Sequence, residues 1–356
     1  MTTSEGDATL TASDRSAEPP LPAIDLVAGV KIDRYVVERR LGAGGMGVVY
    51  AARDTELGRE VALKIVRPRA GVDAMQSRLR REAKAMARLS HRNVVPVFDI
   101  GTHDGQLFIA MELVAGDTLR SWVTRPRPWR DAVQLFVKAG RGLEAAHAAG
   151  LVHRDFKPDN VVIGHGDEPR ITDFGLAREL GEGDGPPSTP PSEGGELSQV
   201  TATGSLAGTP AYMAPEQLLG RHSGPAADQF SFCVSLYEVL YGARPFRPVT
   251  ARPEAQVSEI RAGRIARPTA ARGVPGWIHA ALVRGLAFEP ARRWPSMAAL
   301  VDALDGKRRA RRRRVAAVVA GLALAAGGGL GATAVLRDRD RTPPASCLDL
   351  ALKGND

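Results

Sequence analysis

The spacing of hydrophobic and polar positions is strand-like in the first third of the chain and becomes helical after about residue 129. From Tyr35 onward, short runs rich in β-branched residues are bounded by glycines and charges: YVVERRLG, GVVYAARD and REVALKIV. Such runs are typical of an antiparallel meander. Residues 77–90 have helical spacing, and two more strand-like runs follow, NVVPVFDIG and LFIAMELV. The pattern predicts a strand-rich lobe over about residues 35–114.

From Trp129 onward helical spacing dominates, as in DAVQLFVKAGRGLEAAHAAG and DQFSFCVSLYEVLYG. We therefore predict an α+β chain whose second lobe, over about residues 115–305, is mainly helical. Residues 1–34 are rich in small, acidic and proline residues and predict a disordered tail. Within residues 181–199, 13 of 19 residues are Gly, Pro, Ser or Thr, which predicts a flexible insertion.

The chain ends in a pattern typical of a membrane anchor. Residues 306–314 contain the basic run KRRARRRR, and residues 315–336 carry no charge. As a helix those 22 residues would be about 33 Å long, enough for a bilayer core of about 30 Å. The alternative is a buried helix of a soluble domain, since the segment is only moderately apolar. The basic side should be cytoplasmic, which predicts a single-pass protein of the inner membrane with a short extracytoplasmic tail, residues 337–356.

The net charge of +8 is confined to one patch. Removing the seven basic residues of that run leaves 8 − 7 = +1. A nucleic-acid patch is the alternative reading of the run, but its position beside an apolar span favours a topology anchor or anionic lipid headgroups, and we expect no nucleic-acid partner. Cys233 and Cys347 have no metal or disulfide spacing.

The first chemical motif is glycine-rich and consists of Gly42, Ala43, Gly44, Gly45, Met46 and Gly47. In a dinucleotide-binding unit such a pattern lies between a strand and a helix, whereas strand-like runs flank it here. A Walker loop needs Gly-Lys-Ser/Thr, and Gly47 is followed by Val48. A glycine-rich hairpin remains, whose backbone can lie close over phosphates.

Lys64 is the second feature, because it lies on an otherwise apolar strand. A solvated lysine at a sheet edge is the alternative. Glu82, on the helix that follows, is a suitable anionic partner. That pair would hold the ammonium group against the phosphates of ATP.

The third motif is His153-Arg154-Asp155-Phe156-Lys157-Pro158-Asp159-Asn160, with Asp173-Phe174-Gly175 beginning 18 residues after Asp155. Phosphoryl transfer needs the γ-phosphate, metal ions and acceptor hydroxyl held in line, with the developing charge neutralised. One carboxylate to orient the hydroxyl, one lysine, and an Asn with a second Asp for magnesium satisfy these needs. Any one acid could be a surface loop residue, but all four elements in this order are improbable by chance.

On these motifs the chain resembles the eukaryotic-like protein kinases, in their bacterial transmembrane serine/threonine branch, from about Tyr35 to Leu304. The resemblance implies a bilobal protein kinase fold, with an antiparallel sheet in the N-lobe and a mainly helical C-lobe, plus one transmembrane helix. It implies a non-specific serine/threonine protein kinase that converts ATP and protein to ADP and phosphoprotein. Asp155 would be the catalytic base and Lys157 would assist at the transferred phosphate, which favours Ser/Thr over Tyr.

The resemblance also implies the cofactors ATP and Mg²⁺, with Mn²⁺ as an alternative ion. Asn160 and Asp173 would hold the metal, and Lys64, paired with Glu82, would contact the α/β-phosphates. Met111 would be the gatekeeper before the hinge. The implied ATP-binding residues are Leu41, Gly42, Ala43, Gly44, Gly45, Met46, Gly47, Val49, Ala62, Lys64, Glu82, Met111, Glu112, Val114, Asn160, Val162 and Asp173.

Other residues have structural roles by the same resemblance. His153 would lie under the active site, and Asp228 would brace the catalytic-loop backbone. Glu216 would pair with Arg293 in a buried bridge. Thr209 would contact Asp155 and Lys157. Cys233, on an apolar helix, is interpreted as core packing.

The main rival reading is a pseudokinase or ATP-binding scaffold. Phe156 and Asp159 replace the commoner Leu and Glu, but both lie outside the chemistry. Every expected catalytic residue is present, which favours an active enzyme with protein substrates.

Regulation is predicted at Thr201 and Thr203, which align with activation-loop phosphothreonines in similar bacterial kinases, with Arg154 as the phosphate receptor. Unmodified loop hydroxyls are the alternative. Gly327 and Gly331 form one GxxxG spacing, which is typical of a dimerising membrane helix and predicts a homodimer. A chance match in an Ala/Gly-rich segment is the alternative.

Overall fold

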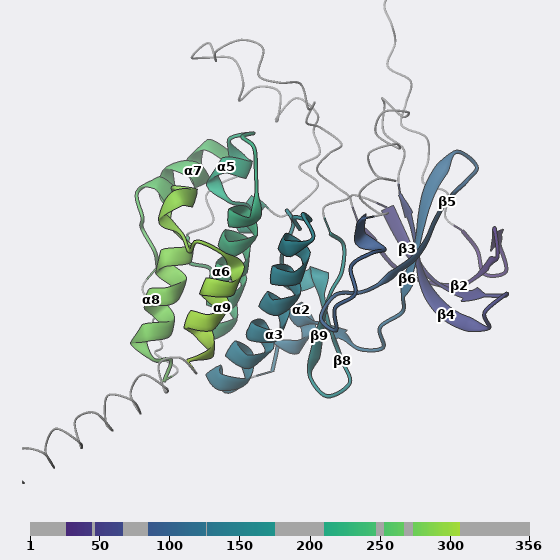
Figure 1. Ribbon diagram of the computed structural model, residues 1–356, viewed down its shortest axis with the longest axis horizontal. Coiled ribbons are helices and arrows are strands. Elements are labelled where there is room, and N and C mark those ends of the chain that lie inside the picture. The colour runs from purple at the N-terminus through teal and green to yellow at the C-terminus, as the bar shows by residue number, and fades with distance from the viewer. Residues whose placement is uncertain are drawn as a thin grey trace, which may run out of the picture. The chain divides into compact units, whose positions relative to one another are not determined.

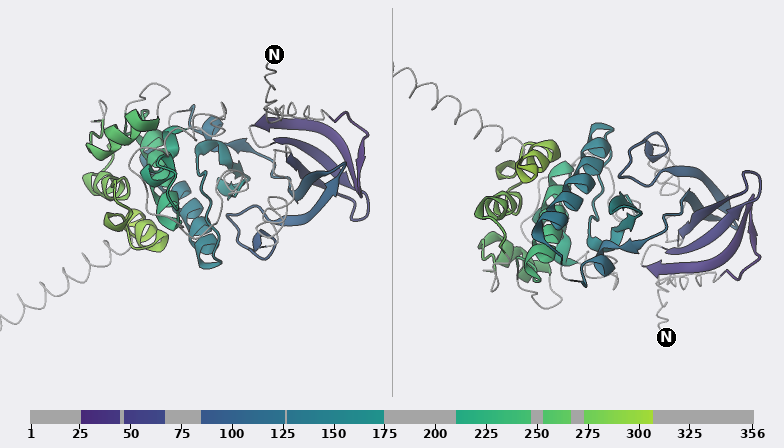
Figure 2. Two further views of the ribbon diagram at one scale, coloured as in Figure 1. Left: turned by 90° about the horizontal axis from the view of Figure 1, so that it is seen from above. Right: turned by 90° about the horizontal axis from the view of Figure 1, so that it is seen from below.

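A six-stranded antiparallel sheet forms the first lobe (Figure 1). The computed structural model describes residues 26–44, 47–66, 85–125, 127–174, 210–246, 253–266 and 273–306. The strands are β1 (Lys31–Ile32), β2 (Tyr35–Gly44), β3 (Gly47–Asp54), β4 (Arg59–Val66), β5 (Val97–His103) and β6 (Gln106–Glu112), in the spatial order β1-β2-β3-β4-β6-β5. Figure 2 shows them as a twisted sheet separate from the helices of the second lobe.

Alternation along β4 explains how a lysine comes to face the interior. Val61 and Leu63 belong to an apolar cluster on one face of the sheet. Ala62 and Val66 belong to the larger cluster on the other face. Because successive side chains of a strand point to opposite faces, Lys64 shares the face of Ala62 and Val66.

The N-lobe begins before Tyr35, which corrects part of the predicted tail over residues 1–34. Lys31 pairs with Val36 across β1 and β2, and the side chain of Ile32 is fully buried. The amide of Gly29 donates to Val37 O at 2.8 Å. Residues 26–34 are therefore part of the fold, and residues 1–25 lie outside the described residues.

The second lobe is mainly helical, as predicted. Its helices are α2 (Leu119–Trp122), α3 (Trp129–Ala148), α5 (Pro215–Leu218), α6 (Pro225–Tyr241), α7 (Pro253–Arg261), α8 (Gly276–Gly285) and α9 (Met297–Asp305), with 3-10 turns η1 (Pro158–Asn160), η2 (Pro210–Tyr212) and η3 (Pro290–Arg292). A small antiparallel sheet has the order β7 (Asp117–Thr118), β8 (Val161–Gly164) and β9 (Glu168–Ile171).

Helix α6 is the central element of this lobe. Pro225 occupies its first turn, and Gly242, at φ 73°, ends it in the left-handed conformation that glycine adopts without strain. Phe232 of α6 meets Phe136 of α3 edge to face at 5.2 Å between ring centres. Cys233 is fully buried, as its interpretation as a core residue requires.

Backbone hydrogen bonds join the segment that enters β5 to the end of β9. Val94 and Ile171 form a parallel bridge. The amide of Ile171 donates to Asn93 O, and the amide of Val95 donates to Ile171 O, both at 2.9 Å. The side chain of Asn93 donates to Pro169 O at 2.9 Å. The segment before β5 in the strand-rich lobe and the small sheet of the second lobe are thus joined by backbone hydrogen bonds.

Within the part of the chain that the structure describes, no helix combines the length and apolarity needed to cross a bilayer. The predicted span 315–336 is not among these residues, nor are the segments 307–314 and 337–356 or the insertion 181–199.

Candidate active site

The loop between α3 and β8 presents Asp155 with one carboxylate oxygen held and the other available. Lys157 Nζ donates to Asp155 Oδ2 at 2.7 Å. Asn160 Nδ2 donates to Asp155 O at 2.8 Å and to Oδ2 at 3.1 Å. Among the described residues no donor reaches Oδ1. This arrangement leaves Oδ1 able to accept a proton or a hydrogen bond from an acceptor hydroxyl.

Asp228 braces the backbone of this loop, as predicted. Its Oδ2 accepts from the amide of His153 at 2.8 Å, and its Oδ1 accepts from the amide of Arg154 at 2.7 Å. His153 is fully buried and its Nε2 donates to Thr172 O at 2.9 Å. Arg154 has φ 62°, a strained conformation for a residue with a side chain, and these bonds hold it there.

Lys64 and Asp173 form an ion pair between the two lobes. Lys64 Nζ lies 2.6 Å from Asp173 Oδ1, and the Lys64 side chain is almost wholly buried. Burial acts to raise the pKa of Asp173, but the charge and hydrogen bond of Lys64, helped by His153 and Lys157, hold that pKa below its ordinary value. The predicted partner of Lys64, Glu82, lies outside the described residues.

The backbone itself brings Asp173 close to Asn160. The amide of Thr172 donates to Asn160 O at 2.9 Å, which aligns the residue after β9 with η1. Asp173 has φ 59°, so this is the second strained non-glycine residue of the site, after Arg154. The backbone bond therefore fixes Asp173 one residue beyond a contact with Asn160.

The glycine-rich motif is the hairpin between β2 and β3, as predicted. Gly44 pairs with Gly47 at its end, and Gly45 and Met46 lie outside the described residues. A Cβ on Gly47 would lie 2.0 Å from Ile65 O, so only glycine allows β3 to approach β4 this closely. Leu41 is exposed before the hairpin, next to Gly42 and Ala43.

Six of the implied ATP-binding residues lie on the strands β3, β4, β6 and β8 and in the hinge that continues from β6. Ala62 and Met111 are cross-strand partners of β4 and β6, and both are buried. Val49 and Val114 pack against the same apolar cluster. Val162 of β8 is half-buried. The hinge residue Glu112 forms an ion pair with Arg170, with 3.1 Å between Glu112 Oε2 and Arg170 Nη1.

The predicted buried bridge is present. Arg293 Nη1 lies 2.7 Å from Glu216 Oε1, and Nη2 lies 2.8 Å from Oε2. Arg293 is 1% exposed and also donates to the carbonyls of Ala226, Ala287 and Phe288. Thr201, Thr203 and Thr209, which were predicted to be regulatory or substrate-docking residues, lie outside the described residues.

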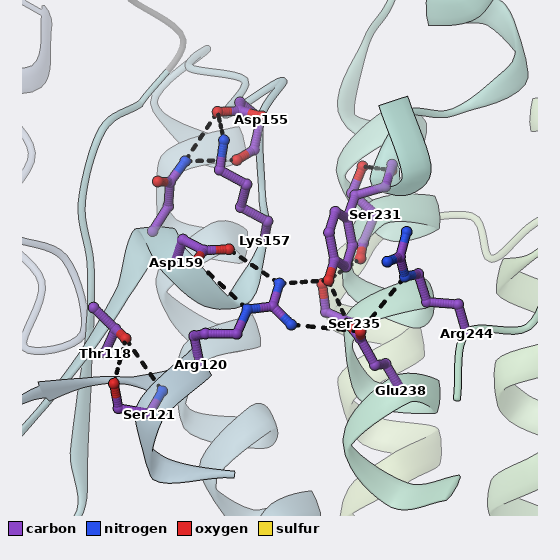
Figure 3. Close-up of polar contacts among 12 residues, drawn as sticks. Thr118, Arg120, Ser121, Asp155, Lys157, Asp159, Ser231, Ser235, Glu238 and Arg244 are labelled. Carbon is purple, nitrogen blue, oxygen red and sulfur yellow. Dashed lines mark hydrogen bonds and ion pairs between the residues drawn. The ribbon is translucent and has the colours of Figure 1, made fainter. Parts of the chain in front are cut away.

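Sequence reasoning missed a polar network beside the catalytic loop. Arg120 contacts Asp159, Tyr212 and Glu238, residues from three other segments (Figure 3). No motif contains Arg120, and the contacts span up to 118 positions along the chain, from 238 − 120. Only the folded structure brings these residues together.

The fold and this arrangement define a protein kinase domain. The chain matches the protein kinase domain family over residues 35–281 and belongs to it. The kinase domain of PknI from Mycobacterium tuberculosis aligns with 79% of this chain and 98% of its own, at a TM-score of 0.59 and 28% identity.

Among curated proteins, this chain is similar to the serine/threonine-protein kinases PknL and PknA of Mycobacterium tuberculosis. PknL is 38% identical over 216 residues, which are 60% of this chain and 50% of PknL. PknA is 38% identical over 221 residues, 60% of this chain and 48% of PknA. The chain thus spans about half the length of these relatives.

Proposed function

We propose that this chain is a serine/threonine protein kinase that transfers the γ-phosphoryl group of ATP to hydroxyl groups of proteins. The observation that carries the proposal is the convergence of Asp155, Lys157, Asn160 and the Lys64–Asp173 pair at one site. Because phosphoryl transfer depends on positioning and charge neutralisation, this set meets its needs without a covalent nucleophile.

Each side chain has a role that follows from its position. Asp155 Oδ1 accepts the hydrogen bond of the acceptor hydroxyl and orients it. Lys157, already within 2.7 Å of Asp155, offsets negative charge on the transferred group. When ATP binds, the ammonium group of Lys64 contacts the ATP phosphates and its ion pair with Asp173 weakens. The glycine-rich hairpin supplies backbone amides that donate to the same phosphates. These roles and the assignment of the implied ATP-binding residues are proposals.

The chain's residues fit a magnesium ion bound together with phosphates. Asn160 uses Nδ2 for Asp155, which leaves its amide oxygen for a cation, and Asp173 contributes a carboxylate. No cluster of three or more His, Cys, Asp or Glu that could hold a metal occurs in the described ranges. Mg²⁺ commonly takes one or two protein oxygens plus phosphates and water, so two ligands suffice. Mn²⁺, with the same preference for oxygen, is the alternative ion.

Transfer of labelled phosphate by the full-length chain tests the activity. Wild type with ATP and Mg²⁺ should label itself or a Ser/Thr peptide. Asp155→Asn should abolish labelling, while Asp104→Asn, the same change in an exposed turn, should retain it. ATP binding without labelling in wild type would instead support the ATP-binding scaffold.

We further propose that phosphorylation of Thr201 or Thr203 raises activity through pairing with Arg154, as the resemblance implies. Phosphopeptide mapping should locate the phosphate on these residues. Replacing both with Ala and finding unchanged activity would contradict the proposal.

The proposed location is the inner membrane, with residues 315–336 as the single span and the kinase domain cytoplasmic. Support comes from the uncharged length and the preceding basic run. Full-length protein should sediment with membranes and resist carbonate extraction, and a chain ending at residue 306 should not.

We also propose that the span forms a homodimer through the GxxxG spacing of Gly327 and Gly331. Crosslinking in membranes tests this proposal, and detection of the monomer alone would contradict it.

A further inference from the structure

Five polar residues form a network beside the catalytic loop, which we call the Arg120 network: Arg120, Asp159, Tyr212, Glu238 and Arg244. Arg120 Nη2 lies 3.0 Å from Asp159 Oδ2, and its Nη1 lies 3.4 Å from Glu238 Oε1. Arg244 Nε lies 3.5 Å from Glu238 Oε1. Tyr212 accepts from Arg120 and donates to Glu238. Both carboxylates are therefore occupied by guanidinium groups.

The network adjoins the site of phosphoryl transfer. Asp159 is two residues beyond Lys157 and lies on η1 next to Asn160. Figure 3 shows Arg120 between Asp159 and Glu238, with Lys157 and Asp155 directly beyond Asp159. The side chains of Asp159 and Arg120 are 47% and 39% exposed. A protein segment that presents its hydroxyl to Asp155 can therefore contact this surface.

The charges of the network cancel. Two guanidinium groups face two carboxylates, and Tyr212 adds none, because burial and its hydrogen bond to Glu238 raise its pKa to about 12. Arg120 forms ion pairs with both Asp159 and Glu238, whereas Arg244 forms one with Glu238. Removing the positive charge of Arg120 would leave one negative charge in excess beside Asp155.

We propose that Arg120 is a specificity-determining residue, which rests on the proposed kinase function. By occupying Asp159 and Glu238, it withholds two carboxylates from Lys or Arg side chains that flank the acceptor hydroxyl. The chain accordingly phosphorylates sites without a requirement for flanking basic residues.

The test compares matched peptides in which a single Arg or Gln is scanned through the positions on both sides of the acceptor. The readout is the ratio of kcat/KM for the Arg peptide to that for the Gln peptide, so a general change in activity cancels. Full-length wild type should give a ratio near one at each position. Arg120→Gln should raise it about fivefold at one or more positions, and added salt should reduce the rise.

Two controls separate charge from structure. Arg120→Lys, which keeps the charge, should keep the wild-type ratio. Arg120→Gln combined with Asp159→Asn, which restores neutrality, should return the ratio toward one. An unchanged ratio in Arg120→Gln, or a wild-type ratio already near five, would overturn the proposal.

A second variant covers the case in which Arg120→Gln is inactive. Asp159→Asn leaves the network with one excess positive charge and should favour Glu over Gln peptides; no shift would overturn the proposal. Failure of the proposed function looks different, since wild type would then label no peptide above the background of Asp155→Asn.

Discussion

Asp228 accepts a hydrogen bond from the backbone amide of His153 at 2.8 Å, and it does so from inside α6 with no exposed surface of its own. The second oxygen does the same for the next amide along the chain. A largely buried helix of the C-lobe thus sets the conformation of the loop that carries Asp155. Core packing and the position of the proposed base are linked through one carboxylate.

Asp228→Asn should both destabilise the protein and reduce activity. One acceptor oxygen becomes an amide donor, which leaves a buried backbone N–H without a partner, at a cost of about 1–3 kcal/mol. Chemical denaturation and peptide phosphorylation measure the two effects. Asp104→Asn, in the exposed β5–β6 turn, is the control. A stability equal to that of the control would contradict this reading of Asp228.

Arg293 and Glu216 should show strong coupling in a double-mutant cycle. Arg293→Met leaves Glu216 buried without its cation, and a broken buried ion pair costs about 3–5 kcal/mol. Adding Glu216→Leu removes the stranded carboxylate, so the double variant should be less destabilised than the sum of the single variants. Full recovery is not expected, because three backbone carbonyls also lose the donors of Arg293. Additive effects in urea unfolding would argue against a coupled pair.

The Lys64–Asp173 pair should make stability depend on pH in a defined direction. The pKa of Asp173 is lower in the fold than its ordinary value, so the pair contributes stability above the ordinary carboxyl pKa of about 4. That contribution is lost as pH falls through the lower folded-state pKa.

The measurement is the difference in unfolding free energy between wild type and Lys64→Met. This difference should be largest near neutral pH and shrink in acid, because Asp173 without its negative charge no longer attracts the ammonium group of Lys64. Lys138→Met, which removes a more exposed lysine paired with Glu168, is the control and should have a smaller effect. A difference that stays constant from neutral to acid pH would contradict the assignment.

Gly285 and Cys233 should behave as a suppressor pair. A Cβ on Gly285 would lie 2.3 Å from Cys233 Sγ, so Gly285→Ala should cost about 1–3 kcal/mol through overpacking between α8 and α6. Adding Cys233→Ala removes the sulfur and leaves the two Cβ atoms 3.4 Å apart, which should recover much of the loss. If thermal unfolding shows the double variant to be less stable than Gly285→Ala, this packing is wrong.

The thiol of Cys233 should be unreactive in the native protein. Burial raises its pKa well above the ordinary value, which keeps it protonated, and it has no exposed surface. In a Cys347→Ser background, iodoacetamide at about pH 8 should modify Cys233 only after denaturant is added. Modification of the native chain, detected by mass spectrometry, would place Cys233 in an accessible position.

Local motifs made the chemistry predictable from sequence. Asp155, Lys157 and Asn160 are within six residues of one another, so their spacing alone brings them together. Periodicity predicted the two lobes because one lobe alternates with period two and the other follows helical spacing. The bridge between Glu216 and Arg293 spans 77 positions and was predictable only from the resemblance.

Contacts without a motif were not predictable. Arg120 is an ordinary arginine in the sequence, and its partners become neighbours only when α6 and η2 pack beside η1. Asp173 as the partner of Lys64, 109 positions away, was likewise not predicted as a pair. The N-lobe boundary was misplaced because β1 has only two residues, too few for periodicity to register.

The shared backbone bonds between Asn93, Val95 and Ile171 have a consequence for how the chain comes apart. A strand pairing that joins residues about 76 positions apart forces the segment before β5 and the end of β9 to open together. The amides of Val95 and Ile171 should therefore exchange with solvent as one slow cooperative group. Two polypeptides made by cutting at the hinge would each lack half of that pairing, and neither would keep it without the other.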